Sequence, residues 1–281
     1  MGALMDNFFQ EYETAFDGWT GTKPHQRSSR LSVSNTGDPG VVGPPAVASL
    51  YDAMSNSPWS EPVEGGRPSN WRWREPSSCG SKEPGAEANG DTDDPSEVAL
   101  ERAIVATAGH ENWTYQMSTS SGMGSKQQNK RRAIDLVTRI DDDTYRFTEL
   151  KLNRDTPLFA IREILGYGLA YLHTRRCIAQ SHKAKAWMRA TNVELAVLGP
   201  TDWYDGYVGR LCPAAELRWL VEAINHGLHA LSQRFDGLSR LVLELRAFEK
   251  APLDRMANAI ANARDVPYSL ETSRIDRVPG A

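Results

Sequence analysis

Two strand-like segments on either side of three consecutive aspartates constrain the fold of this chain more than any other feature of its sequence. Residues 133–140 (AIDLVTRI) and 144–151 (TYRFTELK) are rich in β-branched and aromatic side chains, and Asp141–Asp143 separates them. Asp tolerates the conformations that tight hairpin loops need. We therefore expect an antiparallel hairpin with a three-residue loop, in which residue 140 pairs with residue 144, 139 with 145, and so on.

This register brings two carboxylates and one ammonium group to one face of the hairpin. Asp135 faces Glu149, and the small Ala133 faces Lys151, which lies two residues after Glu149 and on the same face. Two opposed carboxylates repel each other, so the pair requires a cation, a shared proton or solvent. Carboxylates at a sheet edge suit Mg²⁺ or Mn²⁺, and a nearby lysine could orient water or stabilise charge on phosphorus. The alternative interpretation is an exposed Glu149–Lys151 pair on an edge strand.

The segments around the hairpin predict the element order α-β-β-β-α-β followed by α-β-α. This order is typical of an α/β fold with a mixed central sheet flanked by helices. The first helix is expected to follow Asp94 as its N-cap, with Pro95 in the first helical position. Further strands are expected in NWTYQMSTSS, VELAVLGP and LSRLVLELRAF, and further helices in TPLFAIREILGYGLAYLHTRR, AAELRWLVEAINHGLHALSQRF and PLDRMANAIANAR.

The composition of the chain changes near residue 94. Residues 1–94 contain long Gly-, Pro- and Ser-rich stretches, which bury little apolar area, so we expect a flexible N-terminal region with a helix only at Ala46–Met54. This region, with its Trp-rich NWRWRE segment, could bind a protein partner. Residues 95–266 form the expected folded domain, and residues 267–281 a C-terminal tail.

Charge and cysteine content narrow the class of protein. The formal net charge is −4, so there is no overall basic footprint for nucleic acid, and any such surface must be local. The 3 cysteines are scattered and show neither a disulfide framework nor zinc spacing, which fits a reducing compartment. No apolar run reaches the roughly 18 residues of a membrane span, and the N-terminus lacks signal-peptide features. We expect an intracellular protein of the cytoplasm, with the nucleus as the alternative and with no membrane partner.

Asp135, followed on the next strand by Glu149-Leu150-Lys151, resembles the motif of the PD-(D/E)xK nuclease superfamily, the restriction-endonuclease-like fold. The similarity covers about residues 95–200 and includes the α-β-β-β-α-β order of that family's core. It implies that Asp135, Glu149 and the carbonyl group of Leu150 bind a divalent metal ion. It also implies that Lys151 serves catalysis.

Other positions both support and depart from the family pattern. Glu101 in LERAI is similar to a further metal ligand that many members carry on the first helix. Exonuclease-type members carry Gln-x-x-x-Tyr on the helix after the lysine strand; here Tyr167 matches, but Glu163 replaces the Gln, with Arg162 beside it. That replacement puts DNA contacts of the exonuclease kind in doubt. Ile134 stands where the motif has its proline, which many members also lack.

The segment GSKQQNKRR (124–132) is a basic lead into the Asp135 strand. The predicted nucleic-acid-binding residues are Lys126, Lys130, Arg131, Arg132, Arg162 and Tyr167. Together the residues predict a nuclease that depends on Mg²⁺ or Mn²⁺ and hydrolyses phosphodiester bonds of nucleic acid, with DNA as the favoured substrate. The alternative is a catalytically silent module on the same fold that binds nucleic acid or a protein partner.

Overall fold

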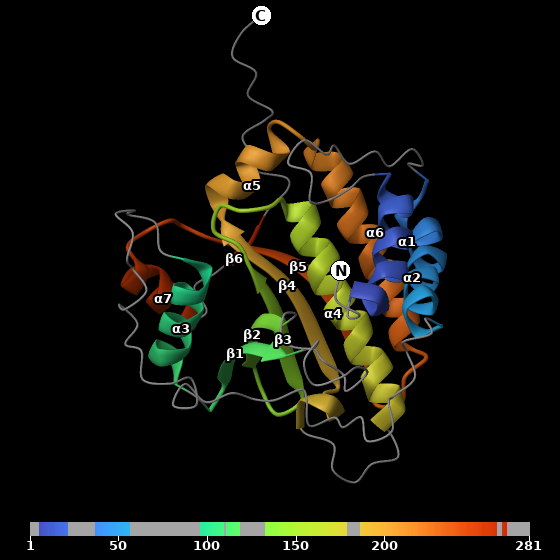
Figure 1. Cartoon of the computed structure of the whole chain (residues 1–281), viewed down its shortest axis with the longest axis horizontal. Helices are drawn as coiled ribbons and strands as arrows, with labels where there is room; N and C mark the ends of the chain where they lie inside the picture. Colours follow the sequence, from blue (N-terminus) through green and yellow to red (C-terminus); the bar gives the residue numbers. More distant parts are fainter. Residues whose placement is uncertain are drawn as a thin grey trace, which may run out of the picture.

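A mixed β-sheet forms the centre of the chain in a computed structural model that describes residues 6–21, 37–56, 96–109, 111–118, 133–178, 186–262 and 266–268 (Figure 1). Its strands are β1 (Trp113–Ser118), β2 (Ala133–Arg139), β3 (Thr144–Leu150), β4 (Asn192–Pro200), β5 (Arg240–Phe248) and β6 (Val266–Pro267). They lie in the sheet in their order along the chain. The pairs β3–β4 and β4–β5 are parallel, and the other neighbouring pairs are antiparallel. The predicted α/β class with a mixed central sheet is confirmed.

The hairpin of β2 and β3 has the predicted register. Val137 pairs with Phe147 and Arg139 with Tyr145, and the loop is closed by the Ile140 amide, which donates to the Thr144 carbonyl at 2.9 Å. The ladder ends with Leu136 and Thr148, before the predicted pairs of Asp135 with Glu149 and of Ala133 with Lys151, so neither of these two pairs belongs to the ladder. Just after β3 ends at Leu150, the Lys151 amide donates to the carbonyl of Leu198 on β4 at 2.9 Å.

Helices cover both faces of the sheet. On one face lie α4 (Pro157–Ile178) and α6 (Ala214–Ser232), and on the other α3 (Glu97–Ala108) and α7 (Leu253–Ala261) (Figure 1). The short helices α5 (Thr201–Val208) and η3 (Ala186–Arg189) flank β4 in the sequence. The helix α3 begins after Ser96, not after the predicted Asp94, because the Ser96 hydroxyl accepts the Ala99 amide at 3.2 Å and so caps the helix.

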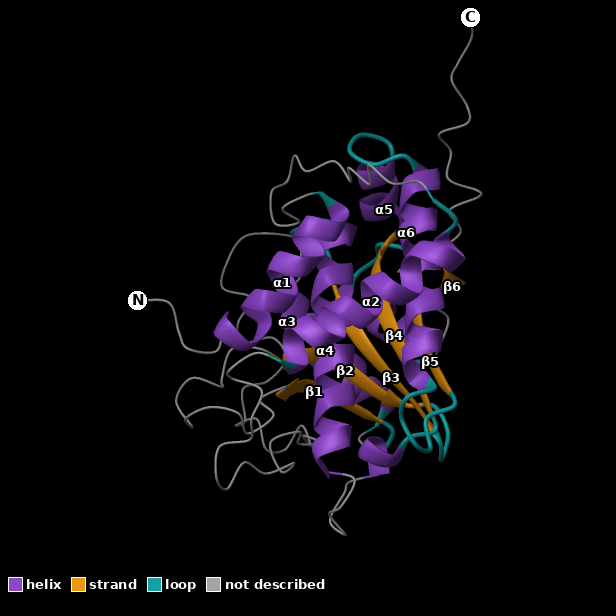
Figure 2. Ribbon diagram, turned by 90° about the vertical axis from the view of Figure 1, so that its right-hand side faces the viewer, coloured by secondary structure: helices purple, strands orange, loops and turns teal. Residues whose placement is uncertain are grey.

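The described N-terminal segments form two further helices, which corrects the prediction of a single short helix there. These are α1 (Asp6–Thr20) and α2 (Pro39–Ser55), whereas the sequence predicted a helix only at Ala46–Met54. They form an outer layer against α4 and α6 (Figure 2). Phe9, Tyr12 and Phe16 recur at helical spacing on α1 and are fully buried, so this stripe attaches the N-terminal segment to the core.

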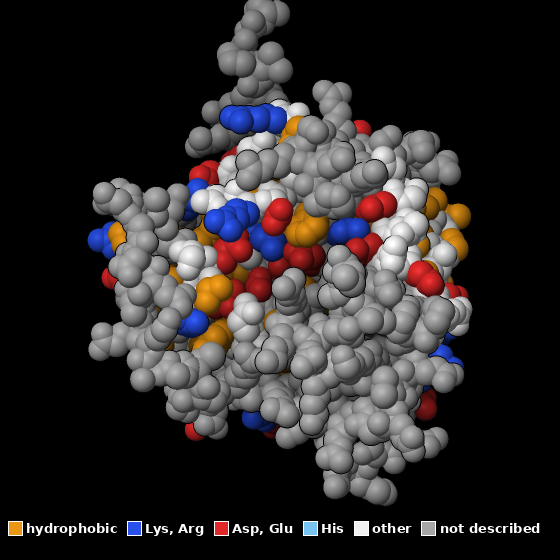
Figure 3. Space-filling model, viewed as in Figure 1, with side chains coloured by type: hydrophobic (Ala, Val, Ile, Leu, Met, Phe, Trp, Pro, Cys, Tyr) orange, Lys and Arg blue, Asp and Glu red, His pale blue; other side chains and the backbone are white. Residues whose placement is uncertain are grey.

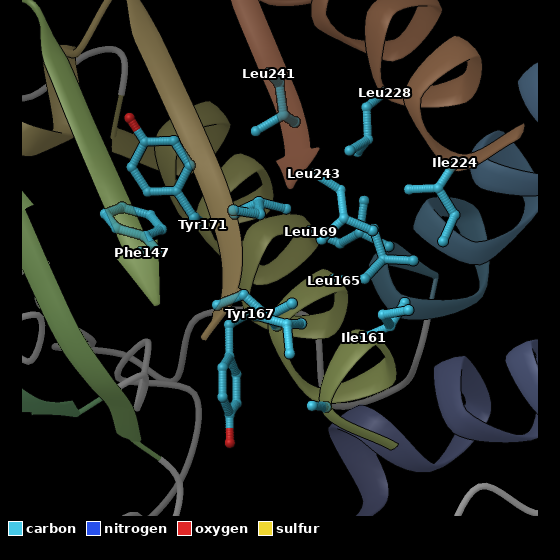
Figure 4. Packing of buried hydrophobic residues seen from close by; sticks show 14 of the residues in the cluster. Phe147, Ile161, Leu165, Tyr167, Leu169, Tyr171, Ile224, Leu228, Leu241 and Leu243 are labelled. Atoms are coloured by element: carbon cyan, nitrogen blue, oxygen red, sulfur yellow. The ribbon is translucent and has the colours of Figure 1, made fainter. Parts of the chain in front are cut away.

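The main core fills the space between the sheet and its α4–α6 face. Phe147 from β3 meets Tyr171 from α4 edge-to-face, with ring centroids 5.1 Å apart, and Leu165, Leu228 and Leu243 continue the packing (Figure 4). A second, smaller apolar cluster lies on the opposite face, between the sheet, α3 and α7. No helix in the described part of the chain is long and apolar enough to cross a membrane.

Candidate active site

The candidate site lies at the carboxyl end of β3, between α3 on one face of the sheet and α4 on the other. The loop 151–156 leads from β3 into α4, and α3 approaches from the other face of the sheet. In space-filling view, Asp and Glu side chains gather near the centre of this face of the molecule, with Lys and Arg side chains beside them (Figure 3). The ends of parallel strands are common positions for ligand sites in α/β folds.

Asp135 is held by the hairpin that the sequence predicted. One carboxylate oxygen, Oδ2, accepts the backbone amide of Leu150 at 2.9 Å, just beyond the end of the β2–β3 ladder. The other oxygen, Oδ1, accepts the side-chain amide of Gln116 at 3.3 Å. The residue as a whole is half-buried.

Lys151 lies between two carboxylates. Its Nζ is 2.6 Å from Oε1 of Glu149 and 3.1 Å from Oε2 of Glu163 on α4. It also lies 5.8 Å from the centre of the Phe159 ring. Lys151 is only 6 % exposed, so the predicted acid–lysine pair is a buried ion pair and not the exposed surface pair of the alternative interpretation.

Glu101 completes the cluster from α3. It is 1 % exposed, and its Oε2 accepts the Gln116 side-chain amide at 2.7 Å, so one amide connects Glu101 to Asp135. Glu97, at the start of α3, accepts the Leu152 amide at 3.1 Å and so connects α3 to the loop after Lys151. The structure therefore brings together Asp135, Glu149, Lys151 and Glu101.

Burial and mutual repulsion change the protonation of these groups. Burial, and then the charge of Asp135, raise the pKa of Glu101 to about 9. Burial also raises the pKa of Asp135 to about 7, against the opposing effect of Lys151, and burial raises the pKa of Glu149 well above its usual value. For Lys151, burial alone lowers the pKa, but Glu149, Glu163 and Asp135 together raise it above its usual value. The cluster therefore holds more carboxyl groups than its lysine can neutralise.

The oxygen-rich donor set fits a hard divalent cation in its chemistry. The Oε2 atom of Glu149 is buried and has no hydrogen-bond partner among the described residues, an arrangement that normally requires a ligand or a proton. No group of three or more His, Cys, Asp and Glu side chains in the described part of the chain has the geometry to hold a metal ion. Here Lys151 and Gln116 contact the carboxylates that would otherwise surround a cation.

The two predicted nucleic-acid contacts that the structure describes, Arg162 and Tyr167, both contact α1. Arg162 is 7 % exposed and forms ion pairs with Glu13 (3.3 Å) and Asp17 (3.5 Å) of α1. Tyr167 is 4 % exposed, and its ring packs edge-to-face on Phe9 at 6.0 Å. Both side chains therefore attach α1 to α4 in this structure. The other predicted contacts, Lys126, Lys130, Arg131 and Arg132, lie outside the described residues.

Sequence reasoning missed two residues of the cluster. Gln116 interrupts an otherwise regular strand with a φ of 49°, and no feature of the surrounding sequence signals that conformation. Glu163 was noted only as a departure from the family pattern, but the structure places it on Lys151. Its position at the second turn of α4, shortly after the Lys151 loop, was the available signal.

Comparison of the chain with family models, with curated proteins and with solved structures found no match.

Proposed function

We propose that this chain is a metal-dependent nuclease that hydrolyses phosphodiester bonds of nucleic acid, with DNA as the favoured substrate, on a restriction-endonuclease-like fold. The observation that carries the proposal is the convergence of Asp135, Glu149, Glu101 and Lys151 at the carboxyl end of β3. This set matches the metal-binding and catalytic positions of the PD-(D/E)xK motif. A buried excess of carboxylates would be costly without a function that uses it.

Asp135, Glu149 and Glu101 are the side chains that would hold Mg²⁺ or Mn²⁺, together with the Leu150 carbonyl group that the resemblance implies. The ion, when bound, would supply positive charge to the scissile phosphate and lower the pKa of an attacking water molecule. The chain's own part is to exclude bulk water and to fix the carboxylates. The Leu150 amide fixes the carboxylate of Asp135 by a hydrogen bond, and the Lys151 amine fixes that of Glu149 in the same way.

Lys151 would act as a fixed positive charge next to the phosphate. Because its pKa is raised, its amine is protonated at neutral pH and can stabilise negative charge that develops on phosphate oxygens. Glu149 and Glu163 hold that amine in place from two sides. Arg154 is exposed in the loop, three residues after Lys151, and its guanidinium group would contact a neighbouring phosphate of the substrate.

The test is cleavage of single- and double-stranded DNA and RNA with Mg²⁺ or Mn²⁺ by the parent chain and by Asp135→Asn and Lys151→Met. We expect metal-dependent cutting that falls at least about 100-fold in both variants, the scale typical of lost electrostatic or acid–base assistance. Lys250→Met is the matched control, since Lys250 is 44 % exposed and its partner Asp202 lies at the surface, 3.3 Å away. Cutting by Lys151→Met at the parental rate would refute the mechanism.

A catalytically silent binding module is the second candidate. Two observations favour it: Arg162 and Tyr167 are covered by α1, and Lys151 is saturated by two carboxylates. A silent module would bind nucleic acid or a protein partner, the latter through residues 1–94, with no cutting under any metal condition. Binding without metal-dependent cleavage by the parent chain would favour this candidate.

A further inference from the structure

Gln116 occupies the position between two candidate metal ligands. It lies on β1 between the pairs Tyr115–Leu136 and Met117–Ile134, so it faces Asp135 across the antiparallel ladder. Its Nε2 donates to Glu101 at 2.7 Å and to Asp135 at 3.3 Å. A single polar nitrogen thus contacts carboxylates from two different elements, α3 and β2.

The backbone of Gln116 is held in a conformation that glutamine rarely adopts. Its φ is 49°, and the pairing of β1 with β2 skips this residue. Asp155, in the loop after Lys151, is the other non-glycine residue with positive φ in the described part of the chain. Such conformations cost about 1–3 kcal/mol each and concentrate at functional sites.

A second observation points to a ligand at this cluster independently of Gln116. The Glu149 side chain is 4 % exposed, and its Oε2 is without a hydrogen-bond partner among the described residues. An unpartnered, buried carboxylate oxygen beside a second carboxylate is a position where a cation would be stabilised.

We propose that Gln116 is a further ligand of the divalent cation, which it would bind through its side-chain carbonyl oxygen between Glu101 and Asp135. The inference rests on the proposed metal-dependent function. A primary amide carries an NH₂ group and a carbonyl oxygen on the same carbon, so half a turn about its last bond exchanges them. The NH₂ group faces the two carboxylates in this structure, and the oxygen would face a cation.

The residue type suits this exchange. A glutamate would add a fourth carboxyl group to the cluster of Glu101, Asp135 and Glu149, and a lysine would remain as a permanent competitor of the cation. Glutamine satisfies the carboxylates when no cation is bound, and its amide oxygen belongs to the ligand class that Mg²⁺ and Mn²⁺ accept.

The test is the affinity of the purified full chain for Mn²⁺ alone, measured by calorimetry and by electron paramagnetic resonance. Gln116→Gly removes the amide, and glycine tolerates the positive φ without strain, so the variant should fold. We expect it to weaken Mn²⁺ binding about 10-fold, the lower end of the range for changes around metal sites. Gln116→Glu keeps an oxygen at this position and should bind Mn²⁺ at least as tightly as the parent. Gln233→Ala, at an exposed glutamine just after α6, is the control and should leave Mn²⁺ binding unchanged.

The outcomes separate this inference from the proposed function. Unchanged Mn²⁺ affinity in Gln116→Gly would overturn it, as would equal losses in Gln116→Gly and Gln116→Glu, which would mark Gln116 as a hydrogen-bond donor only. If the parent cuts nucleic acid in a metal-dependent way, either of these two outcomes would overturn the role of Gln116 and leave the nuclease proposal standing. The expected Mn²⁺ pattern without any cutting by the parent would support the ligand and refute the nuclease.

Discussion

The carboxyl group of Glu101 lies in the interior beside that of Asp135, and this makes stability depend on pH. Burial, followed by the charge of Asp135, raises the pKa of Glu101 from 4.5 to about 9. Between those values the folded protein binds more protons than the unfolded chain, so the free energy of unfolding falls as pH rises. Without divalent cations this one group contributes a fall of at most about 1.4 kcal/mol per pH unit.

We therefore expect Glu101→Gln to flatten the pH dependence of stability. The reason is that the amide of the variant cannot ionise. Urea unfolding at pH 6, 7 and 8 in the presence of a chelator would measure the pH dependence of the free energy of unfolding. Glu222→Gln, at an exposed position on α6, should keep the parental slope. Parallel curves for the parent and Glu101→Gln would contradict the buried carboxyl pair.

At the scale of single residues, the sequence predicted which residues of the cluster lie near each other better than it predicted which hydrogen bonds and ion pairs they form. The nearness of Asp135, Glu149 and Lys151 follows from loop length and strand alternation, both of which are local properties. The contact of Lys151 with Glu163 does not follow from local properties, because it depends on how α4 packs against the sheet. Gln116 was missed because its positive φ has no signature in the surrounding residues.

At the scale of elements, α2 and α6 pack so closely that a glycine is required between them. A Cβ atom added at Gly43 would lie 1.9 Å from the carbonyl oxygen of Ala223, a backbone atom that cannot move aside. We expect Gly43→Ala to lower the free energy of unfolding by about 1–3 kcal/mol, the usual cost of overpacking. Urea denaturation would measure the loss.

Gly18 on α1 offers the matched control. A Cβ atom there would meet nothing within 4 Å, so Gly18→Ala should stabilise the protein by up to about 1 kcal/mol through helix propensity alone. Changes of the same sign and size in the two variants would show that α2 and α6 do not pack as described.

Elements with a clear hydrophobic period were predictable, and those with unusual composition were not. The β2–β3 hairpin and the helices α4, α6 and α7 follow directly from periodicity and turn residues. The helix α2 contains Pro44 and Pro45 in its interior, and the sequence predicted only its second half, Ala46–Met54, as helix, because Gly and Pro dominate the first half. Its stability comes from packing against α6, which is a tertiary property that local propensity does not report.

At the scale of the whole molecule, a boundary at residue 94 would divide one core into two parts. Phe9, Phe16, Val47 and Met54 belong to the same apolar cluster as the side chains of α4 and α6. We expect a chain that begins at residue 95 to expose that surface, to bind the dye ANS and to aggregate. A peptide of residues 1–56 added during refolding should reduce both effects. A soluble, cooperatively unfolding chain from residue 95 would restore the boundary predicted from composition.

The packing of the N-terminal helices against α6 also has a consequence for the ribosome. The indole of Trp219 donates to the carbonyl of Gly37 across 182 residues of sequence. At typical rates of translation, α2 leaves the exit tunnel roughly 10–35 s before α6 leaves it. For that time the surface of α2 that packs on α6 has no native partner, so the nascent chain depends on chaperones or on transient contacts that must later be exchanged for α6. The helix α2, although it is made well before α6, therefore reaches its final place only after α6 has been made.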